Sequence, residues 1–249
     1  MVGAGPAGST AARALAIAGA RVTILEKSRF PRQKPCGGAI SLRALSRFPY
    51  LAAALARIST HRVSRLFLEG PGGASATVDS LDPAVLMIRR VEFDELLMRL
   101  ACEAGADLLE GVEITHASLE EHGVKLVDRR GRCYGASFVV AGDGVNSMVA
   151  RRLGLNAGWP AAHLALDMME ETPSEELRAA DPGAIWVSYC PEGSCGYAYV
   201  FPKRDHVNVG TGSLLSHFRE RAAEKPYARQ RQLVDGLASR GLLVGSSSR

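Results

Sequence analysis

The sequence lacks both a long apolar run and a secretory leader pattern. Arg13 interrupts the alanine-rich start, and Arg57 closes the apolar stretch at residues 50–56. A membrane-spanning helix needs roughly 18 consecutive apolar residues, so we expect none. The first residues form a glycine turn rather than a basic head followed by an apolar core, so we expect no signal peptide.

Cysteine is scarce and shows no CxxC spacing. The five cysteines are Cys36, Cys102, Cys133, Cys190 and Cys195. An odd number without that spacing fits the reduced thiols of a cytoplasmic protein better than disulfides, so we expect a cytoplasmic location. Cys190 and Cys195 leave a disulfide or a metal site open, but no histidine stands at ligand spacing beside them, and we predict no metal.

An excess of one charge is nearly absent too. Lysine and arginine number 30 against 26 aspartates and glutamates, and the difference is spread along the chain without interleaved aromatics. Nucleic acid is therefore not an expected partner. What the chain does have is core material, because 249 residues of which 47% are hydrophobic suffice for one large domain or two modest ones.

The first part of the chain alternates helical and strand-like segments. The pattern predicts a glycine turn and helix ending at Gly19, a strand over residues 21–25 that closes on Glu26, and a loop over residues 27–35. Apolar residues at helical spacing predict a helix over residues 92–104, capped near Gly105. Further predicted elements are strands at residues 108–115, 123–127 and 136–141, the last of them buried, and a helix at residues 147–153.

Strand-like alternation dominates elsewhere. Residues 62–70 and 74–80 are predicted to form antiparallel strands around a turn at residues 71–73. Residues 186–212 are predicted to form a mainly antiparallel sheet with a turn at residues 191–193. The helical spacing of residues 214–238 is broken at Pro226.

Gly3, Gly5 and Gly8 form a GxGxxG pattern. Such glycines allow a tight turn, close approach of the backbone to a pyrophosphate, and close packing of helix on strand. We expect the helix to open at Gly8 with its positive dipole end toward the phosphates. Glu26 ends the next strand roughly 20 residues on, where a carboxylate accepts hydrogen bonds from a ribose and repels a 2′-phosphate. The pattern favours FAD or NAD over NADP; the alternative is a glycine-rich turn with an unrelated surface glutamate.

Only Met1 and Val2 precede this turn, so the strand expected at the centre of a parallel sheet is nearly absent. We expect either a start further upstream or a sheet with exposed strand edges.

Five segments carry a resemblance to a known family. Residues 2–27 resemble flavoproteins of the group that includes para-hydroxybenzoate hydroxylase. Four further motifs, in order, resemble the geranylgeranyl reductase family: KPCGG at residues 34–38, RxxFD at 90–94, AGDGVNSMVARRLG at 141–154 and GYAYVFPKRDHVNVGTG at 196–212. The resemblance implies an α/β fold, with a Rossmann-type FAD-binding domain and a mainly antiparallel substrate-binding sheet.

The resemblance also implies roles for individual residues. Cys36 is expected near the reacting double bond, as a proton donor or a modulator of the flavin. The segment around Tyr199 is expected to line an isoprenoid pocket. The implied cofactor-binding residues are Gly3, Gly5, Pro6, Ala7, Gly8, Glu26, Lys27, Gly37, Gly38, Arg90, Asp143 and Gly144, and the implied substrate-binding residues are Tyr197, Tyr199, Phe201 and Pro202.

Each role has a plain alternative. Cys36 can be a small space-filling residue, and Asp143 can cap the helix that follows it. Arg89 and Arg90 can be a solvated helix start. The aromatic residues at 197, 199 and 201 share one face of a strand, as in any sheet core. The basic loop residues Lys27, Arg29, Arg32 and Lys34 can hold phosphates or simply be solvated.

Two departures from the family concern its pocket and its third flavin motif. Tyr199 stands where the family usually has tryptophan. The family continues into LLVGDAAG, whereas this sequence has LLVGSSSR at residues 242–249, with Ser246 at the aspartate position. We therefore interpret the chain as truncated at both ends relative to the family, and expect weakened flavin binding.

The expected function is FAD-dependent reduction of carbon–carbon double bonds in an isoprenoid, with NADPH or reduced ferredoxin as electron donor. Peripheral membrane contact is left open because such substrates dissolve in lipid. The alternatives are a flavin monooxygenase or halogenase of the same fold, and a non-catalytic FAD-binding remnant. We expect an FAD-binding domain over residues 1–155, with 61–87 crossing to the substrate sheet, and a substrate domain with a helical end over 156–249.

Overall fold

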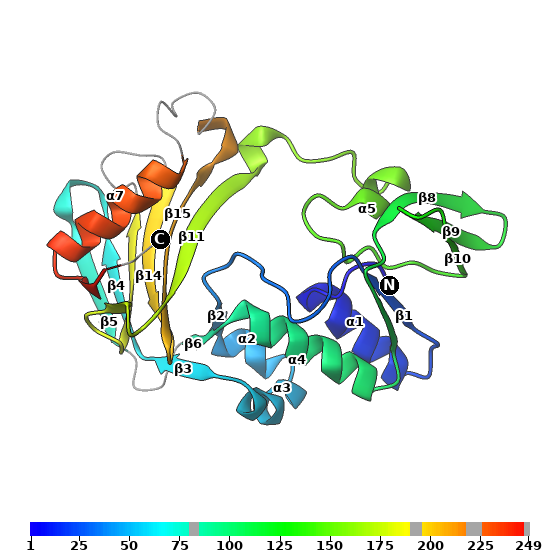
Figure 1. Cartoon of the computed structure of the whole chain (residues 1–249), viewed down its shortest axis with the longest axis horizontal. Coiled ribbons are helices and arrows are strands. Elements are labelled where there is room, and N and C mark those ends of the chain that lie inside the picture. Colours follow the sequence, from blue (N-terminus) through cyan, green and yellow to red (C-terminus); the bar gives the residue numbers. More distant parts are fainter. Residues whose placement is uncertain (80–84, 190–195, 218–225, 247–249) are drawn as a thin grey trace. The chain divides into compact units, whose positions relative to one another are not determined.

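The computed structural model describes residues 1–79, 85–189, 196–217 and 226–246. The chain forms two compact units: unit 1 comprises residues 1–33 and 91–158, and unit 2 comprises residues 34–90 and 159–249 (Figure 1). Each unit draws on two chain segments. The sequence predicted an FAD-binding domain over residues 1–155 and a substrate domain over residues 156–249. That division, which is based on the ligand of each part, stays a prediction.

Unit 1 is built on a Rossmann-type core. A parallel pair of strands, β1 (Thr23–Glu26) and β7 (Asp107–Glu110), packs with helices α1 (Pro6–Ile17) and α4 (Arg90–Glu103). Their shared core consists of Ala4, Ala12, Val22, Ile24, Met98, Ala101 and Ala106. The predicted helix over 92–104 is confirmed. The predicted opening of the first helix at Gly8 is wrong, because α1 begins at Pro6, where a missing N–H costs no hydrogen bond.

Val2 connects this core to the segment that ends at Ala141. Val2 forms isolated parallel bridges to Leu25 and Ala141, so the central strand is reduced to a single residue. The predicted buried strand over 136–141 is wrong: Phe138 is 88% exposed and Val140 is 40% exposed. Ala136 still pairs with Val124 as the last residue of β10. Beyond it, among the described residues, the segment has a single bridge, from Ala141 to Val2, and no ladder.

The rest of unit 1 is a three-stranded antiparallel sheet, β8 (Ile114–Glu120), β9 (Gly123–Asp128) and β10 (Cys133–Ala136), followed by helix α5 (Met148–Arg152). The strand predicted over 108–115 is wrong as a single element. It is divided between β7 and β8, because the chain turns at Gly111 with a φ of 70°. The predicted helix over 147–153 is confirmed as α5, with Ser147 at its N-cap.

Unit 2 is dominated by a six-stranded sheet in the order β11-β15-β14-β13-β4-β5. The pairs are antiparallel except for β13 with β4, so the predicted mainly antiparallel sheet is confirmed. The predicted strand pair around residues 71–73 is confirmed as β4 and β5. The strands are β4 (Arg65–Glu69), β5 (Ser75–Asp79), β11 (Ala165–Pro173), β13 (Ala184–Tyr189), β14 (Gly196–Pro202) and β15 (His206–Leu214).

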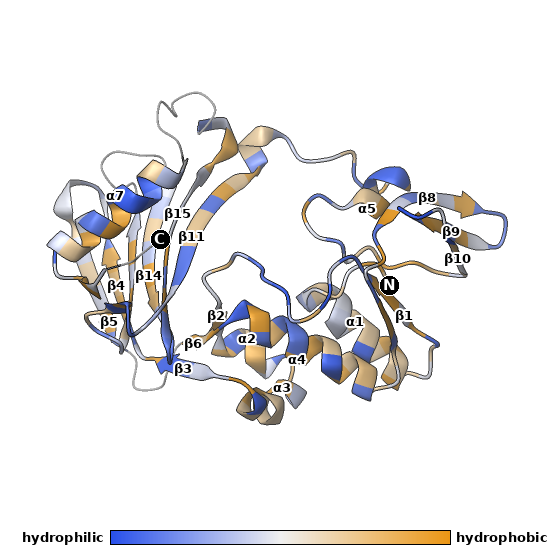
Figure 2. Cartoon of the chain, in the orientation of Figure 1, coloured by the Kyte–Doolittle hydropathy of each residue, from blue (hydrophilic) through white to orange (hydrophobic). Residues whose placement is uncertain are grey.

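One face of this sheet is covered by helix α7 (Pro226–Ser239) (Figure 1). Val234 and Leu237 of the helix pack with Trp186, Val200 and Val209 of the sheet. Figure 2 shows hydrophilic and apolar residues along α7, as expected for a helix with one buried side. In the described part of the chain this helix begins at Pro226, the position of the predicted break. Cys190, Cys195, the predicted turn at 191–193 and residues 218–225 lie outside the described residues.

Smaller elements complete unit 2. The opposite face of the large sheet packs on a small antiparallel sheet, β2-β6-β3, through Val63, Met87 and Ile185. No helix among the described residues is long and apolar enough to cross a membrane. The remaining elements are β2 (Ala39–Ser41), α2 (Leu42–Ser46), α3 (Tyr50–Ala54), β3 (Thr60–Val63), β6 (Val85–Ile88), β12 (Leu177–Ala179) and β16 (Leu243–Gly245).

Candidate functional site

Three glycines from two segments of unit 1 pack backbone against backbone. A Cβ added at Gly8 would lie 1.9 Å from the carbonyl oxygen of Gly3, and one at Gly3 would lie 2.5 Å from the carbonyl oxygen of Gly142. Gly3 also has a φ of 91°, which side chains rarely adopt. Gly3 and Gly8 are therefore required by the fold itself. The sequence prediction missed Gly142, although it stands inside the AGDG motif.

Gly5 is different, because its surroundings are open. Among the described residues, a Cβ there would meet only Nη2 of Arg32, at 3.6 Å. Gly5 is the N-cap of α1 and has no side chain to cap the helix, and no acidic residue stands in the first turn of the helix. The first backbone N–H groups of a helix lack intrahelical acceptors and carry its positive dipole end. This is the physical form of an anion-binding site.

Glu26 lies at the mouth of the turn, at the end of β1. Its Oε2 accepts a hydrogen bond from the backbone N–H of Ala4 at 2.7 Å, and its Oε1 accepts one from the backbone N–H of Ser28 at 3.0 Å. The residue is 4% exposed. Each carboxylate oxygen can accept a second hydrogen bond, so the carboxylate retains capacity toward a ligand.

Arg32 stands out from the other basic loop residues. Its Nη2 lies 3.1 Å from Oδ2 of the fully buried Asp94, and its Nε lies 3.9 Å from Oε1 of Glu26. Lys27, Arg29 and Lys34 are exposed, whereas Arg32 is half-buried. The sequence prediction grouped these four residues and gave Asp94 no role of its own, although Asp94 closes the RxxFD motif. The ion pair fixes one guanidinium beside Gly5.

Asp143 caps the helix that follows it. Its Oδ2 accepts hydrogen bonds from the backbone N–H of Met148 at 2.8 Å and of Val149 at 3.2 Å, and its Oδ1 accepts one from the Ser147 hydroxyl. This is the capping role that the sequence left open. Gly144 is exposed, with a φ of 93°. Contact of these residues with a cofactor stays a prediction.

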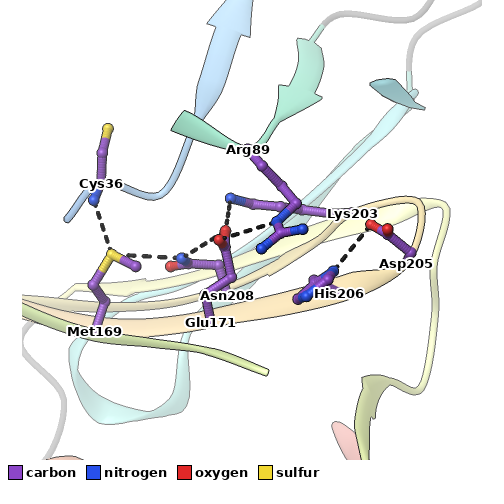
Figure 3. Close-up of polar contacts among 8 residues, drawn as sticks. All are labelled: Cys36, Arg89, Met169, Glu171, Lys203, Asp205, His206 and Asn208. Atoms are coloured by element: carbon purple, nitrogen blue, oxygen red, sulfur yellow. Dashed lines mark hydrogen bonds and ion pairs between the residues drawn. The ribbon is translucent and has the colours of Figure 1, made fainter. Parts of the chain in front are cut away.

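In unit 2, the segment of residues 36–38 lies directly on the large sheet. A Cβ at Gly37 would lie 2.7 Å from two ring carbons of Phe201, and one at Gly38 would lie 2.2 Å from the carbonyl oxygen of Ile88. The backbone N–H of Cys36 contacts Sδ of Met169 at 2.9 Å, and Figure 3 shows the Cys36 sulfur on the side away from Met169. The flat ring beside Gly37 is thus Phe201, and contact with a flavin ring stays a prediction.

The aromatic residues of β14 share one face of the strand. The ring centroids of Tyr197 and Tyr199 are 6.0 Å apart, and those of Tyr199 and Phe201 are 4.4 Å apart. Tyr199 is 2% exposed, whereas Tyr197 and Phe201 are half-buried and Pro202 is buried. Tyr199 therefore has the core role that the sequence left open, and Tyr197 and Phe201 form its partly accessible edge.

The structure also brings together polar side chains that sequence reasoning missed. Lys203 and Arg89 both pair with Glu171, and Asn208 lies beside them (Figure 3). Arg90, which the resemblance favoured over Arg89 for cofactor contact, is half-buried at the start of α4. The motif itself contained one signal, since Lys203 directly follows FP. Glu171 had none, because only the pairing of β11 with β15 brings it here.

A second acidic residue on β11 has an unusual proton affinity. Asp167 is paired with Gly212 of β15, which is in turn paired with Tyr197. Its side chain remains exposed, yet the surrounding atoms remove enough water to raise its pKa to about 6. Among the described residues, Asp167 is thus an acid whose protonation changes close to neutral pH.

The chain is similar in sequence to proteins that are already known. A family model described as FAD binding domain matches residues 1–234. The chain is 34% identical over 225 residues to digeranylgeranylglycerophospholipid reductase 1 of Methanopyrus kandleri, covering 85% of this chain and 56% of that protein. The chain spans about half the length of the curated relatives it matches.

Solved structures agree on the fold. A geranylgeranyl bacteriochlorophyll reductase-like protein of Thermoplasma acidophilum superposes with a TM-score of 0.77 at 22% identity, over 98% of this chain and 64% of that one. The halogenase PltM superposes with a TM-score of 0.76 at 17% identity, over 99% of this chain and 58% of that one. At these identities the likeness shows the fold alone.

Proposed function

The chain belongs to the FAD binding domain family, and from that premise we propose an FAD-dependent reductase of the geranylgeranyl reductase type, which reduces carbon–carbon double bonds of an isoprenoid chain. The observation that carries the proposal is the open cradle at Gly5. There an uncapped helix start, the buried carboxylate of Glu26 and the half-buried guanidinium of Arg32 surround a glycine with no Cβ to obstruct a ligand.

The residues present fit the phosphate and ribose part of FAD. The backbone N–H of Ala7, at the start of α1, and the Arg32 guanidinium supply donors and positive charge for the pyrophosphate. Glu26 supplies acceptors for the ribose hydroxyls. Asp94 holds the guanidinium of Arg32 in place by the ion pair at 3.1 Å. In the proposal, Pro6, Gly8, Lys27, Arg90, Asp143 and Gly144 keep the cofactor-binding roles that the resemblance implies.

The chemistry of the reaction belongs to the cofactor, because reduced FAD supplies the hydride that a double bond accepts. The protein then has to hold the other reactants. We assign to Cys36 the delivery of the accompanying proton, and to Gly37 and Gly38 the approach to the flavin ring. Tyr197 and Phe201, both half-buried, offer an apolar surface to the substrate beside Tyr199 and Pro202.

The substrate class, the electron donor and the location of the enzyme are the more specific parts of the proposal. The substrate class is supported by the names of the relatives, which include a digeranylgeranylglycerophospholipid reductase and a geranylgeranyl diphosphate reductase. We keep NADPH or reduced ferredoxin as the electron donor and a cytoplasmic location. Contact with a membrane surface would bring the enzyme to a lipid-soluble substrate.

A second candidate is an oxygen-dependent flavin enzyme, either a monooxygenase or a halogenase. The observation that favours it is the fold likeness to the halogenase PltM. The same fold serves both chemistries, so the fold does not separate them.

The test is a single-turnover experiment without oxygen. The purified chain is loaded with FAD, reduced chemically and mixed with a geranylgeranyl lipid, and the product is analysed by mass spectrometry. The proposal predicts a gain of two hydrogens for each double bond reduced, in a nitrogen atmosphere. A product that forms only with oxygen would support the second candidate. Loss of all turnover with FAD bound would identify a non-catalytic binding module.

A further inference from the structure

Cross-strand residue pairs of the large sheet place polar side chains beneath the segment of residues 36–38. Glu171 of β11 is paired with Asn208 of β15, which is paired with Phe201 of β14. Two residues away along the same three strands, Met169 is paired with Gly210, which is paired with Tyr199. Side chains two residues apart on a strand share a face. Met169, Glu171 and Asn208 therefore project from the same side of the sheet as the aromatic rings.

Contacts run from Lys203 to Cys36 without a break (Figure 3). The Lys203 ammonium donates to Oε1 of Glu171. The Asn208 amide nitrogen contacts the same oxygen and Sδ of Met169, at 3.5 Å each. Sδ of Met169 accepts the backbone N–H of Cys36 at 2.9 Å. At the other end of the segment, a Cβ at Gly38 would lie 3.0 Å from Nζ of Lys203.

The two charged residues at the end of this series of contacts, Lys203 and Glu171, are largely shielded from water. The Lys203 side chain is 2% exposed and that of Glu171 is 15% exposed. Burial opposes the ionisation of Glu171, but the neighbouring Lys203 and Arg89 outweigh it and lower the pKa of the carboxyl. Burial also lowers the pKa of Lys203, and the Glu171 carboxylate counteracts this. The ammonium and the carboxylate therefore stabilise each other in their charged forms.

From these contacts we infer that Lys203, Glu171, Asn208 and Met169 are positioning residues that dock the Cys36–Gly38 segment on the sheet and thereby fix the Cys36 thiol. The inference rests on the proposed function only for the role given to Cys36. Lys203 acts through Glu171 and Asn208, and it needs no contact with the thiol. The docking itself is a property of the chain without cofactor, so it can be measured without FAD or substrate.

The test measures how fast Cys36 is alkylated by iodoacetamide. The background is a variant in which the other four cysteines, at positions 102, 133, 190 and 195, are serine. Lys203→Met keeps the length of the side chain and removes the charge, while Arg89 remains 3.3 Å from Glu171 and prevents an unpaired carboxylate. We expect alkylation to accelerate about fivefold or more, since a loss of ~1 kcal/mol of docking free energy corresponds to a factor of about 5.

Two further variants test the chain of contacts itself. Met169→Leu removes the acceptor of the Cys36 N–H, and Asn208→Leu removes the link between Met169 and Glu171 without altering charge. Each should accelerate alkylation by a similar factor. Lys203→Met combined with Met169→Leu should be no faster than the faster single variant, because Lys203 acts on the segment through Glu171, Asn208 and Met169, and its charge has no path to the segment once the Met169 acceptor is removed. Asn208→Leu carries the same test should Lys203→Met fail to fold.

The control variant is Arg65→Met. Arg65 is the exposed first residue of β4 and pairs with Asp79 and Asp181, in the same unit. The rate of Cys36 alkylation in this variant should stay within a factor of about 2 of the rate in the background variant. Adding urea below the unfolding transition separates local release of the segment, which responds weakly, from global unfolding, which responds steeply.

An unchanged rate in Lys203→Met and Asn208→Leu would overturn the inference. So would a double variant whose acceleration is the product of the two single effects, and so would an accelerated Arg65→Met control. Because the assay contains no FAD, these failures are distinct from a failure of the proposed function, which would appear as an absence of flavin binding in the same chain.

Discussion

Gly5→Ala separates what the fold requires of the glycine turn from what a ligand requires. Gly5 has φ of −72° and ψ of −179°, an extended conformation that alanine adopts without strain. In the part of the chain that the structure describes, the added methyl group would meet only Nη2 of Arg32 at 3.6 Å, which is an ordinary contact. The remaining cost is that of alanine at an N-cap, about 1 kcal/mol or less.

The same substitution at the neighbouring glycines is a different perturbation. At Gly8 the methyl group would lie 1.9 Å from the Gly3 carbonyl oxygen, and at Gly3 it would lie 2.5 Å from the Gly142 carbonyl oxygen. Backbone atoms at these distances have to move, and overpacking of this kind costs about 1–3 kcal/mol or more. Gly3→Ala and Gly8→Ala should therefore lower the free energy of unfolding well beyond the effect of Gly5→Ala.

Ligand binding should show the reverse. If a pyrophosphate lies against Gly5, the methyl group of Gly5→Ala occupies its place, and FAD affinity should fall tenfold or more, which is about 1.4 kcal/mol. The assays are urea denaturation followed by circular dichroism and titration of FAD followed by flavin fluorescence. Gly236→Ala is the control, because a Cβ there meets nothing within 4 Å, so neither fold nor affinity should suffer. Wild-type FAD affinity in a folded Gly5→Ala chain would refute the reasoning.

Three further predictions concern unit 2. Tyr199→Phe should raise the free energy of unfolding by about 1 kcal/mol, because the buried Tyr199 hydroxyl has no partner among the described residues; chemical denaturation checks this. Gly210→Ala should lower it by about 1–3 kcal/mol, because a Cβ there would lie 2.3 Å from the Tyr199 hydroxyl; a midpoint equal to wild type would contradict this. Asp167→Asn should stabilise the chain above pH 6 and have no effect well below pH 3.8, because the folded state raises the pKa of this acid and so opposes its ionisation; denaturation across pH tests the sign.

Local patterns in the sequence predicted the elements that carry their own signal. Helix α4 follows from apolar residues at helical spacing, and the shared face of Tyr197, Tyr199 and Phe201 follows from strand alternation. Gly5 and Glu26 were predicted together because the GxGxxG pattern and the acidic residue after the next strand form one unit. The structure places the Glu26 carboxylate on the amide of Ala4, at the turn.

What the sequence did not predict depends on pairing between distant segments. The hydrophobic run at residues 136–141 has the composition of a buried strand, yet among the described residues it is paired only at its two ends, Ala136 with Val124 and Ala141 with Val2. Glu171 and Lys203 are separated by 32 residues and meet because β11 pairs with β15. Phe201 lies beside Gly37 because the segment of residues 36–38 packs on the large sheet, and contact of Gly37 with a flavin ring stays a prediction. Which distant segments pair, and in which register, cannot be predicted from the periodicity of one sequence.

The most direct test of the central claim is an equilibrium titration of the purified chain with FAD, with competition by ADP and by 2′-phospho-ADP-ribose. Gly5, Arg32 and Glu26 should bind the part that FAD shares with ADP, so the account predicts saturable flavin quenching that ADP reverses. The 2′-phosphorylated nucleotide should compete poorly, because the Glu26 carboxylate lies at the mouth of the turn. Flavin fluorescence that stays unchanged at high protein concentration, or equal competition by both nucleotides, would contradict it.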